Sequence, residues 1–377
     1  MKSLDDITKR YGTEHALVVL ICRVFLGTAG SDEVDFFIRR QKIDWDRFYH
    51  IVSRNRIRPT SYDVLSKAAI PVALLRMLRN DNKKISFKCI EHLKELLDIS
   101  GALEEMNIHV LPYKGLVLSA AYYPNFHLRE FSDIDFLVLL KNDGDISRLR
   151  DFFRQRGYEP MADIPETFTS IFTQYACEYF FEKHENGERK FHIDIHWLAY
   201  HPSFDLPKAL PNDILFQSPS IINISGKEIK VLNDDSHFIT LILHHGLRES
   251  WAGLKYLLDV AQLIKNGNID WAYQRKMSAT YQYNKVLDTG LALINELFGI
   301  GTDTTQSINT DYYYDLILSG EPRKKPFLKK QLRKILLTDR LSGKLKVLFK
   351  SVKYLFNPSK LDYDYVKLPK SLFFLYF

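Results

Sequence analysis

The segment Ser132–Leu140 reads SDIDFLVLL, and its alternation of acidic and apolar residues constrains the fold more than any other feature of the chain. Successive side chains of a β-strand point to opposite faces, so Asp133 and Asp135 share one face, roughly 7 Å apart along the chain. The apolar residues between and after them point to the other face. We therefore predict a strand over residues 133–140 that has one buried apolar face and one acidic face.

A second alternating segment, FHIDIHW at Phe191–Trp197, places Asp194 on one face between His192 and His196. The dipeptide Asn186-Gly187 precedes it, and this dipeptide is a strong hairpin signal, so we predict paired strands over residues 177–183 and 190–198. An unpaired buried charge is costly. The acidic residue on this strand therefore requires a cation or hydrogen-bond donors nearby.

Helical periodicity dominates the rest of the chain, with apolar residues recurring every three to four positions. We expect an N-terminal helical region over residues 1–84, a core over 85–200, a connector over 201–234 and a C-terminal helical region over 235–377. The helical segments that we predict in the first half span residues 15–26, 44–55, 61–78, 85–106, 116–123 and 146–157, and a further short strand spans 108–113. Pro59 and Pro71 punctuate the helices of the N-terminal region. The predicted fold class is α/β, of the α+β kind, in which helical regions flank a small mixed sheet.

Positive charge is concentrated in one stretch of the chain. The formal net charge is +6, which favours polyanionic partners such as nucleotides, nucleic acid or anionic lipid but equally fits an ordinary basic protein. Residues 321–350 contain eleven Lys or Arg residues and two acidic residues, and the basic positions begin at Arg323. We interpret the stretch 323–350 as a solvated helix face, with nucleic acid or a membrane surface as alternative partners.

The three cysteines, Cys22, Cys89 and Cys177, lie far apart and form no Cys-x-x-Cys pair, which argues against a disulfide framework and a thiolate zinc site. The N-terminus has no apolar signal region, and the longest apolar runs, such as residues 16–22 and 136–140, are shorter than a membrane span. We therefore expect a cytoplasmic protein with no transmembrane segment.

The dipeptide Lys114-Gly115 lies where the first predicted strand turns into a helix. Backbone N–H groups at a helix N-terminus favour an anion, Gly allows a close approach, and Lys supplies positive charge. Ser119, one helical turn later, and Arg129, four residues before Asp133, are further candidates to contact a phosphate chain.

Two carboxylates on one strand face repel each other unless a cation lies between them. Mg²⁺ prefers carboxylate oxygens and substrate phosphates, so Asp133 and Asp135, with Asp194 as a third ligand, form a candidate magnesium site that Mn²⁺ could also occupy. We interpret His192 and His196 as supporting residues. A zinc site of the His-Asp-His type is the alternative, but its three ligands would diverge along a single strand.

These segments together resemble the nucleotidyltransferase fold of the DNA polymerase β superfamily, with a Gly-containing turn and helix, an Asp-x-Asp strand, and a third acid on a later strand. They resemble more closely an uncharacterised bacterial nucleotidyltransferase family that carries Lys-Gly at this turn. The resemblance extends over residues 85–265 and predicts a polymerase β-like core on the mixed sheet. The matching residues are Lys114, Gly115, Arg129, Ser132, Asp133, Ile134, Asp135, Asp194, Ile195, His196 and Trp197, with a helical segment that includes His244, His245, Trp251, Leu254, Lys255 and Asp259.

The resemblance implies that a nucleoside monophosphate is transferred from an NTP to an acceptor hydroxyl while pyrophosphate leaves. Asp133 and Asp135 would hold two metal ions, and Asp194 would hold the ion that activates the acceptor or would act as general base. The expected nucleotide-binding residues are Lys114, Gly115, Ser119, Arg129, Ser132 and Lys255. An ion pair between Lys255 and Asp259, four residues apart on a helix, is the alternative for Lys255.

The sequence does not choose among a small molecule, a sugar, a protein side chain and an RNA end as the acceptor. One alternative function is a toxin or defence-type nucleotidyltransferase that modifies tRNA or protein, and its support is the basic stretch 323–350. A second is a catalytically silent nucleotide-binding module, which the presence of three candidate acids argues against. A phosphatase or nuclease that uses the aspartate pair is a third, and Lys114-Gly115 fits nucleotide binding better.

Overall fold

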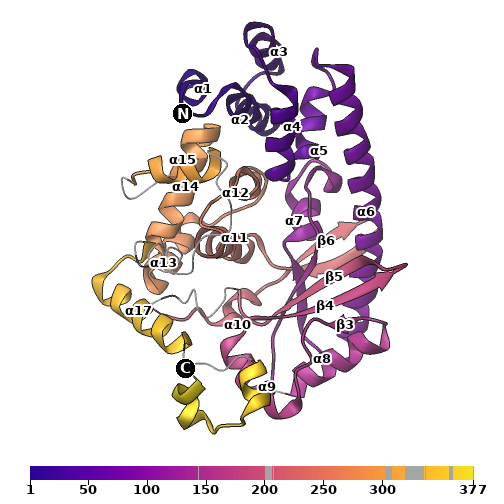
Figure 1. Ribbon diagram of the computed structural model, residues 1–377, viewed down its shortest axis with the longest axis vertical. Helices are drawn as coiled ribbons and strands as arrows, with labels where there is room; N and C mark the ends of the chain where they lie inside the picture. Colours follow the sequence, from indigo (N-terminus) through magenta and orange to yellow (C-terminus); the bar gives the residue numbers. More distant parts are fainter. Residues whose placement is uncertain are drawn as a thin grey trace.

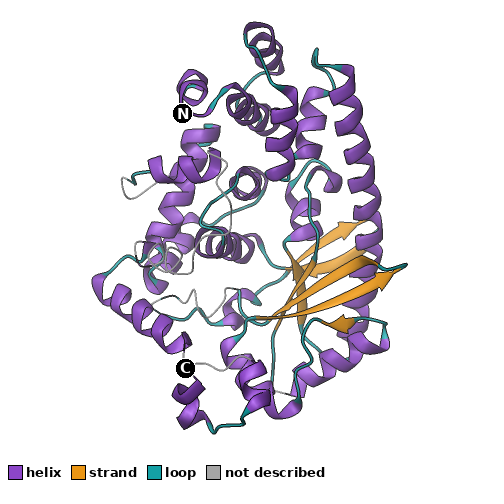
Figure 2. Cartoon of the chain, viewed as in Figure 1, coloured by secondary structure: helices purple, strands orange, loops and turns teal. Residues whose placement is uncertain are grey.

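A mixed β-sheet lies at one side of the molecule, and helices cover it and extend away from it (Figures 1 and 2). The structure is a computed structural model of the 377-residue chain. It describes residues 1–142, 144–199, 206, 208–301, 308–318, 335, 337–355 and 360–376.

The sheet has the strand order β1-β2-β5-β4-β3 and the mixed character that the sequence predicts. Its central pair, β2 and β5, is parallel, whereas the other neighbouring strands are antiparallel. The predicted hairpin is confirmed, since β4 and β5 pair on either side of Asn186-Gly187. The strands are β1 (Val110–Tyr113), β2 (Ile134–Val138), β3 (Glu159–Pro160), β4 (Glu178–Glu185) and β5 (Glu188–His196).

Helices precede the sheet, connect its strands and follow it. Before β1 the chain forms α1 (Leu4–Tyr11), α2 (Thr13–Leu26), α3 (Ser31–Arg40), α4 (Trp45–Arg54), α5 (Arg58–Leu65) and α6 (Val72–Glu105). Between strands lie α7 (Gly115–Tyr122), a 3₁₀ helix (Phe126–Leu128), α8 (Gly144–Gln155) and α9 (Glu166–Tyr175). The described helices after β5 are α10 (Asn212–Leu215), α11 (Asp234–Leu243), a π-helical turn (His244–Arg248), α12 (Leu254–Asn266), α13 (Trp271–Tyr281), α14 (Asn284–Phe298), α15 (Asp311–Leu318), α17 (Leu341–Leu355), α18 (Lys360–Tyr365) and a final 3₁₀ helix (Lys370–Tyr376).

One face of the sheet is apolar and is covered by helices. Phe136 of β2 and Ile193 of β5 belong to a buried cluster that also contains Leu96 of α6 and Phe153 of α8. This face is the one to which the strand alternation assigns the apolar residues. The acidic residues of β2 and β5 therefore point to the opposite face.

A second core lies around α2, which is apolar on almost every side. Its residues from Ala16 to Cys22 are at most 1% exposed. A helix that is apolar all round must be surrounded by other elements. α2 contacts α1, α3, α4 and α5 from its own end of the chain and α12 and α14 from the other end. The N-terminal and C-terminal helices thus share one core.

The structure refines the element boundaries that the sequence predicts. The helical segment predicted over residues 61–78 forms two helices with Pro71 between them, as the position of this proline in the sequence indicates: α5 ends at Leu65 and α6 begins after Pro71. The expected connector contains a small hairpin, β6 (Ser220–Ile224) and β7 (Lys227–Val231). α6 runs without a break across residue 84, where we predicted a domain boundary, so no interruption of the backbone marks that boundary. Within the described residues, none of the helices is both long enough and apolar enough to cross a membrane.

Gly290 of α14 provides a test of the packing in the second core. A Cβ atom at this position would lie 2.5 Å from Trp251 Cζ2, closer than real contacts allow. We expect Gly290→Ala to lower the free energy of unfolding by about 1–3 kcal/mol, because overpacking outweighs the gain in helix propensity. Urea unfolding followed by circular dichroism measures the change.

Gly101 of α6 is the matched control, since a Cβ atom there meets nothing within 4 Å. Gly101→Ala should raise the free energy of unfolding by about 0.5–1 kcal/mol through helix propensity alone. Equal stabilisation by both substitutions would show that Trp251 does not pack tightly against α14.

Candidate active site

A cavity of about 310 Å³ lies over the acidic face of β2 and β5. It brings together most of the predicted site residues, namely Lys114, Gly115, Arg129, Ser132, Asp133, Asp135, Asp194 and Lys255. Its wall also contains residues that the sequence analysis did not assign to nucleotide or metal binding: Arg56, His196, His244, His245, Arg248, Glu249 and Tyr256. The cavity thus collects side chains from the N-terminal helices, the sheet and the C-terminal helices.

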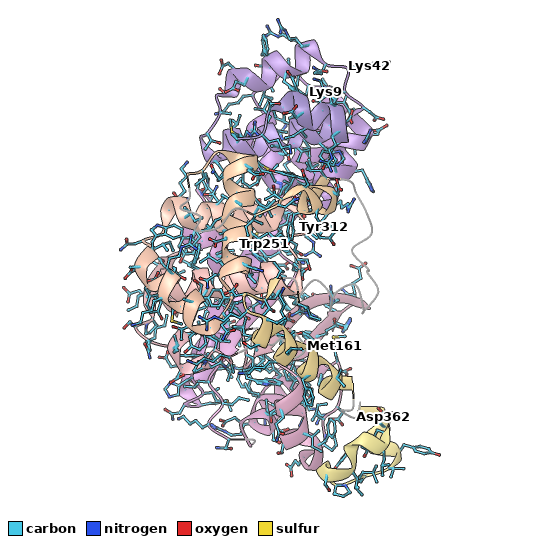
Figure 3. All side chains as sticks on the ribbon, turned by 90° about the vertical axis from the view of Figure 1, so that its left-hand side faces the viewer. Lys9, Lys42, Met161, Trp251, Tyr312 and Asp362 are labelled. Carbon is cyan, nitrogen blue, oxygen red and sulfur yellow. The ribbon has the colours of Figure 1, made fainter. Side chains whose placement is uncertain are left out.

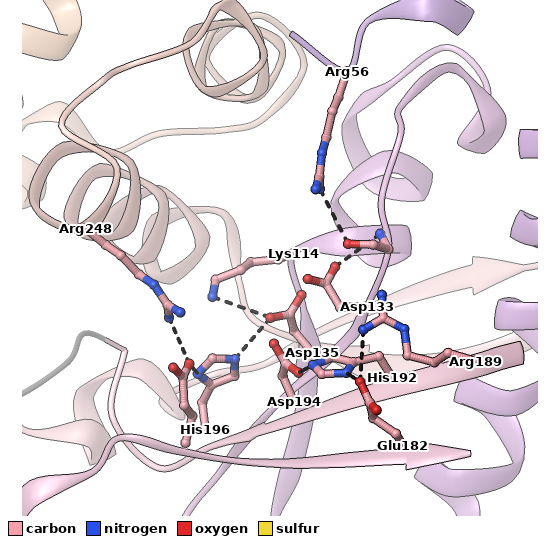
Figure 4. A network of polar contacts seen from close by, with 12 residues as sticks. Arg56, Lys114, Asp133, Asp135, Glu182, Arg189, His192, Asp194, His196 and Arg248 are labelled. Carbon is pink, nitrogen blue, oxygen red and sulfur yellow. Dashed lines mark hydrogen bonds and ion pairs between the residues drawn. The ribbon is translucent and has the colours of Figure 1, made fainter. Parts of the chain in front are cut away.

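The acidic centre of the cavity is formed by the parallel pairing of β2 and β5. Asp135 and Asp194 are direct partners in this register, so their side chains leave the same face of adjacent strands. Asp133 lies immediately before β2 and is half-buried. The carboxylates of Asp133 and Asp135 and that of Asp194, which is distant in the sequence, therefore surround one space (Figure 4).

Cationic groups surround Asp135 within this centre. Lys114 Nζ lies 3.5 Å from Asp135 Oδ1, and His196 Nε2 lies 3.1 Å from the same oxygen. Burial acts to raise the pKa of Asp135, but Lys114 and His196 outweigh it and lower the pKa to about 2. Burial also raises the pKa of Asp194, and the neighbouring charge of Asp135 adds to this effect.

His196 is fixed between two carboxylates. Its Nδ1 lies 3.1 Å from Glu178 Oε2, which also accepts a hydrogen bond of 2.8 Å from Arg248. Burial and Lys114 act to lower the pKa of His196, yet hydrogen bonds with Asp135, Cys177 and Glu178 raise it to about 10. Both ring nitrogens therefore donate, and the imidazolium orients Asp135 toward the cavity (Figure 4).

His192 occupies a similar position beside Asp194. Its Nε2 lies 2.7 Å from Asp194 Oδ1 and its Nδ1 lies 2.9 Å from Glu182 Oε1. The ring nitrogens of His192 and His196 thus point at carboxylates and do not converge on a shared cation. This geometry disfavours the His-Asp-His zinc alternative. The oxygen donors of Asp133, Asp135 and Asp194 are of the kind that Mg²⁺ and Mn²⁺ accept.

The turn at Lys114-Gly115 places the N-terminus of α7 at the cavity. Both residues have positive φ angles, 53° at Lys114 and 36° at Gly115. A Cβ atom at residue 115 would lie 3.2 Å from the carbonyl oxygen of Asp133, so Gly permits the close approach of this turn to the acidic strand. The first N–H groups of α7 and the acidic residues consequently face one space.

Arg129 lines the cavity, but its positive charge is neutralised by the buried carboxylate of Asp259. Its Nε and Nη2 donate to the two carboxylate oxygens of Asp259 at 2.7 and 2.9 Å, and its Nη1 donates to the carbonyl oxygen of Gly115 at 3.0 Å. Tyr123 donates a further hydrogen bond of 2.7 Å to Asp259. Arg129 therefore ties the Lys114-Gly115 turn to α12, and Asp259 pairs with Arg129.

Lys255, on α12, presents a buried ammonium group to the cavity. Lys255 is 9% exposed, and its ammonium has no hydrogen-bond or ion-pair partner within the described part of the chain. Burial, followed by the charge of Arg129, lowers the pKa of Lys255 to about 7. An anion bound in the cavity would supply the missing partner.

Arg56 reaches the cavity from the turn between α4 and α5. Its Nη1 donates to Ser132 Oγ at 3.4 Å, beside the acidic centre. The preceding residue, Asn55, is buried and accepts a hydrogen bond of 3.0 Å from the backbone N–H of Leu254 at the start of α12. This contact holds Arg56 and Lys255 on the same side of the cavity.

Ser119 is the one predicted site residue that does not line the cavity. It is fully buried, and its hydroxyl donates to the carbonyl oxygen of Phe126 at 2.6 Å. Of the residues that the sequence analysis missed, Glu178 had a usable signal, since the hairpin register pairs it with His196. Arg56 had none, because only tertiary packing brings α4 and α5 to the sheet.

A larger cavity, of about 760 Å³, lies elsewhere, between α6, β1 and the β6–β7 hairpin. Its charged lining consists of Glu104, Lys227, Glu228 and Lys230, and Glu104 pairs with Lys230 at 2.6 Å. It contains no cluster of carboxylates on adjacent strands. The chemistry-bearing groups are therefore in the smaller cavity.

Comparison with known proteins identifies the family to which the chain belongs. A family model described as "Uncharacterised nucleotidyltransferase" matches residues 41–299, a range that includes every residue of the acidic cavity. The chain belongs to this uncharacterised nucleotidyltransferase family. No curated protein matches the chain. A solved structure of an antigenic nucleotidyltransferase-like protein from Paracoccidioides brasiliensis aligns with 13% sequence identity and a TM-score of 0.32, covering 53% of this chain and 91% of that chain.

The Arg129–Asp259 pair can be tested through stability. Asp259 is fully buried, so Asp259→Asn leaves the Arg129 guanidinium without its counter-charge. We expect the free energy of unfolding to fall by about 3–5 kcal/mol, because a buried charge loses its partner. Urea unfolding at neutral pH measures the loss.

The control is Asp163→Asn, which removes the exposed pair between Arg154 and Asp163. Their side chains are 45% and 65% exposed, and such pairs contribute about 0–1 kcal/mol. A loss at Asp259 no greater than that at Asp163 would contradict the structural role of the buried pair.

Proposed function

We propose that this protein is a metal-dependent nucleotidyltransferase that moves a nucleoside monophosphate from an NTP to an acceptor hydroxyl and releases pyrophosphate. The observation that carries the proposal is the pairing of Asp135 with Asp194 on parallel strands, beside Asp133 and the N-terminus of α7. Membership of the nucleotidyltransferase family supports the reaction class.

The donor set fits Mg²⁺, with Mn²⁺ as a substitute. The closest ligand atoms of Asp135, Asp194 and His196 lie within 4.8 Å of one another, which is close enough to surround one ion. His196 already orients Asp135, so we assign the ligand role to Asp133, Asp135 and Asp194. The bound ions would activate the acceptor oxygen and neutralise the leaving pyrophosphate.

The nucleotide would bind through its phosphates. Lys114 and the backbone N–H groups that follow Gly115 face the cavity from one side, and the unpartnered ammonium of Lys255 faces it from another. Ser132 lies beside Asp133 and completes the predicted contacts. Arg129 acts by fixing the turn, since Asp259 already neutralises it.

The acceptor would approach Asp194. The raised pKa of Asp194 suits a carboxylate that accepts a proton. His192 Nε2 lies 2.7 Å from Asp194 Oδ1. In the proposed step the acceptor oxygen forms a bond to the α-phosphorus, the bond to the β-phosphate oxygen breaks, and the acceptor proton passes to Asp194. The acceptor class remains open among a small molecule, a protein and RNA, and a cytoplasmic location would supply both NTP and Mg²⁺.

The central test uses α-labelled ATP, GTP, CTP and UTP with Mg²⁺ or Mn²⁺ and a lysate of the source organism. Asp133→Asn/Asp135→Asn should reduce transfer of label and release of pyrophosphate by at least about a hundredfold, because the negative charge of the carboxylates that bind the metal ions is lost. Mass spectrometry of the labelled species identifies the acceptor.

The exposed Asp163→Asn variant serves as the control for this loss and should transfer label at the wild-type rate. Label on tRNA or on a protein would identify a toxin or defence-type enzyme. Nucleotide binding with no transfer under either metal would replace the enzyme proposal with a nucleotide-binding module.

The depressed pKa of Lys255 gives a pH test of nucleotide binding. Lys255 is an ammonium below its pKa of about 7 and is neutral above it, so binding of the phosphates at higher pH must take up a proton. Between pH 7 and 9 the γ-phosphate changes its ionisation little, since its last pKa is roughly 6 and it is already about nine-tenths ionised at pH 7. The dissociation constant of a non-hydrolysable ATP analogue should rise by up to about tenfold per pH unit. Isothermal titration calorimetry measures it.

Lys255→Arg and Lys255→Met are the matched controls. The arginine variant keeps its charge throughout this pH range, so its affinity should stay constant. The methionine variant should bind weakly and equally weakly at each pH. A pH profile of Lys255→Met that matches the wild-type profile would remove Lys255 from the nucleotide site.

A further inference from the structure

α17 exposes a continuous apolar stripe to solvent. Five residues on this helix are between 46% and 79% exposed, namely Leu341, Leu345, Leu348, Phe349 and Val352. Their spacing of i, i+4, i+7, i+8 and i+11 places them on one face of the helix. Val347, on another face, is 3% exposed, so α17 packs against the protein through a different side.

Lysines flank the stripe, and the helix contains no acidic residue. The segment Leu341–Leu355 reads LSGKLKVLFKSVKYL, with four lysines in its sequence. At 100° per residue, Lys344 falls on one side of the apolar face and Lys346 falls on the other. An apolar face bordered by positive charge on both sides is the pattern of a helix that lies in a membrane interface.

The position of α17 leaves this face accessible. The helix lies at the outer edge of the molecule in Figure 1 and on the viewer's side in Figure 3. It also lies outside residues 41–299, the range that matches the nucleotidyltransferase family. The acidic cavity and its chemistry therefore do not account for the stripe.

We propose that α17 docks the protein on an anionic membrane surface, with the apolar stripe inserted among the lipid headgroups and the lysines beside the lipid phosphates. The positive charge and the aliphatic side chains of α17 favour a lipid surface over a second copy of the chain or RNA. A second copy docked stripe to stripe would bring lysines against lysines, with no acid on either helix to neutralise them. RNA would use the lysines but would leave four aliphatic side chains in water, since bases stack on aromatic rings.

The test is flotation of the full-length protein with vesicles of phosphatidylcholine alone or with 30% phosphatidylserine, a composition of about physiological anionic charge. Wild type should float with the anionic vesicles and much less with the neutral ones. Leu348→Asp/Phe349→Asp should lower the fraction bound to anionic vesicles by at least about tenfold. Lys344→Gln and Lys346→Gln should each weaken binding to anionic vesicles by about fivefold and so reduce the preference for anionic lipid.

The matched control is Phe87→Asp/Ile90→Asp on α6, which makes the same chemical change at two residues that are 70% and 57% exposed. This variant should float like wild type, and circular dichroism should show that both double variants are folded. Failure of wild type to float, or unchanged flotation of the α17 double variant, would overturn the proposal.

Two further measurements identify the competing occupants. A dimer in light scattering that the α17 double variant abolishes, without flotation of wild type, would assign the stripe to a second copy and overturn membrane docking. An RNA gel shift that is lost in the lysine variants, again without flotation, would overturn it in favour of RNA. Neither the proposal nor its test depends on catalysis, so loss of transfer activity and loss of flotation are separate results.

Discussion

Asp135 and Asp194 stand side by side on parallel strands, where two like charges repel strongly unless cations surround them. Lys114 and His196 supply positive charge from within the core, and Glu178 and Arg248 hold His196 in place. The acidic centre is therefore the innermost part of a layered charge arrangement. These charged groups come from strands β2, β4 and β5, from the Lys114-Gly115 turn and from the π-helical turn. The charges are therefore fully matched only when the sheet and both turns have come together.

The helical regions are part of the site and do not merely flank it. Asn55 accepts a hydrogen bond from the start of α12, and Arg129 links α12 to the turn before α7. These contacts place Arg56 and Lys255 at the cavity together with the sheet residues. Recognition of a polyphosphate from several sides requires such convergence, because each cation must be held in position before the ligand arrives.

Strand alternation was sufficient to predict the acidic face of each strand, because a period of two residues fixes the face to which each side chain points. The same rule, extended across the hairpin register, also reaches Glu178. The parallel pairing of β2 with β5, which brings Asp194 beside Asp135, depends on tertiary structure. Helical positions were harder to interpret. Ser119 lies one turn into α7, but its hydroxyl donates to the carbonyl oxygen of Phe126. The ion-pair partner of Arg129 is Asp259, which lies 130 positions later in the sequence. The strands of the β6–β7 hairpin were missed because short elements between proline and polar clusters carry little periodicity.

The buried helix α2 has a consequence for the way in which the chain is made. Its apolar surface is covered partly by α12 and α14, which begin more than two hundred residues later. At ribosomal rates of roughly 5–20 residues per second, α12 and α14 are synthesised on the order of 10–50 seconds after α2. During that interval the apolar segment from Ala16 to Cys22 is available to chaperones and to other nascent chains. The core around α2 therefore cannot be completed before α12 and α14 emerge, and the yield of the protein in a cell depends on what shields α2 until then.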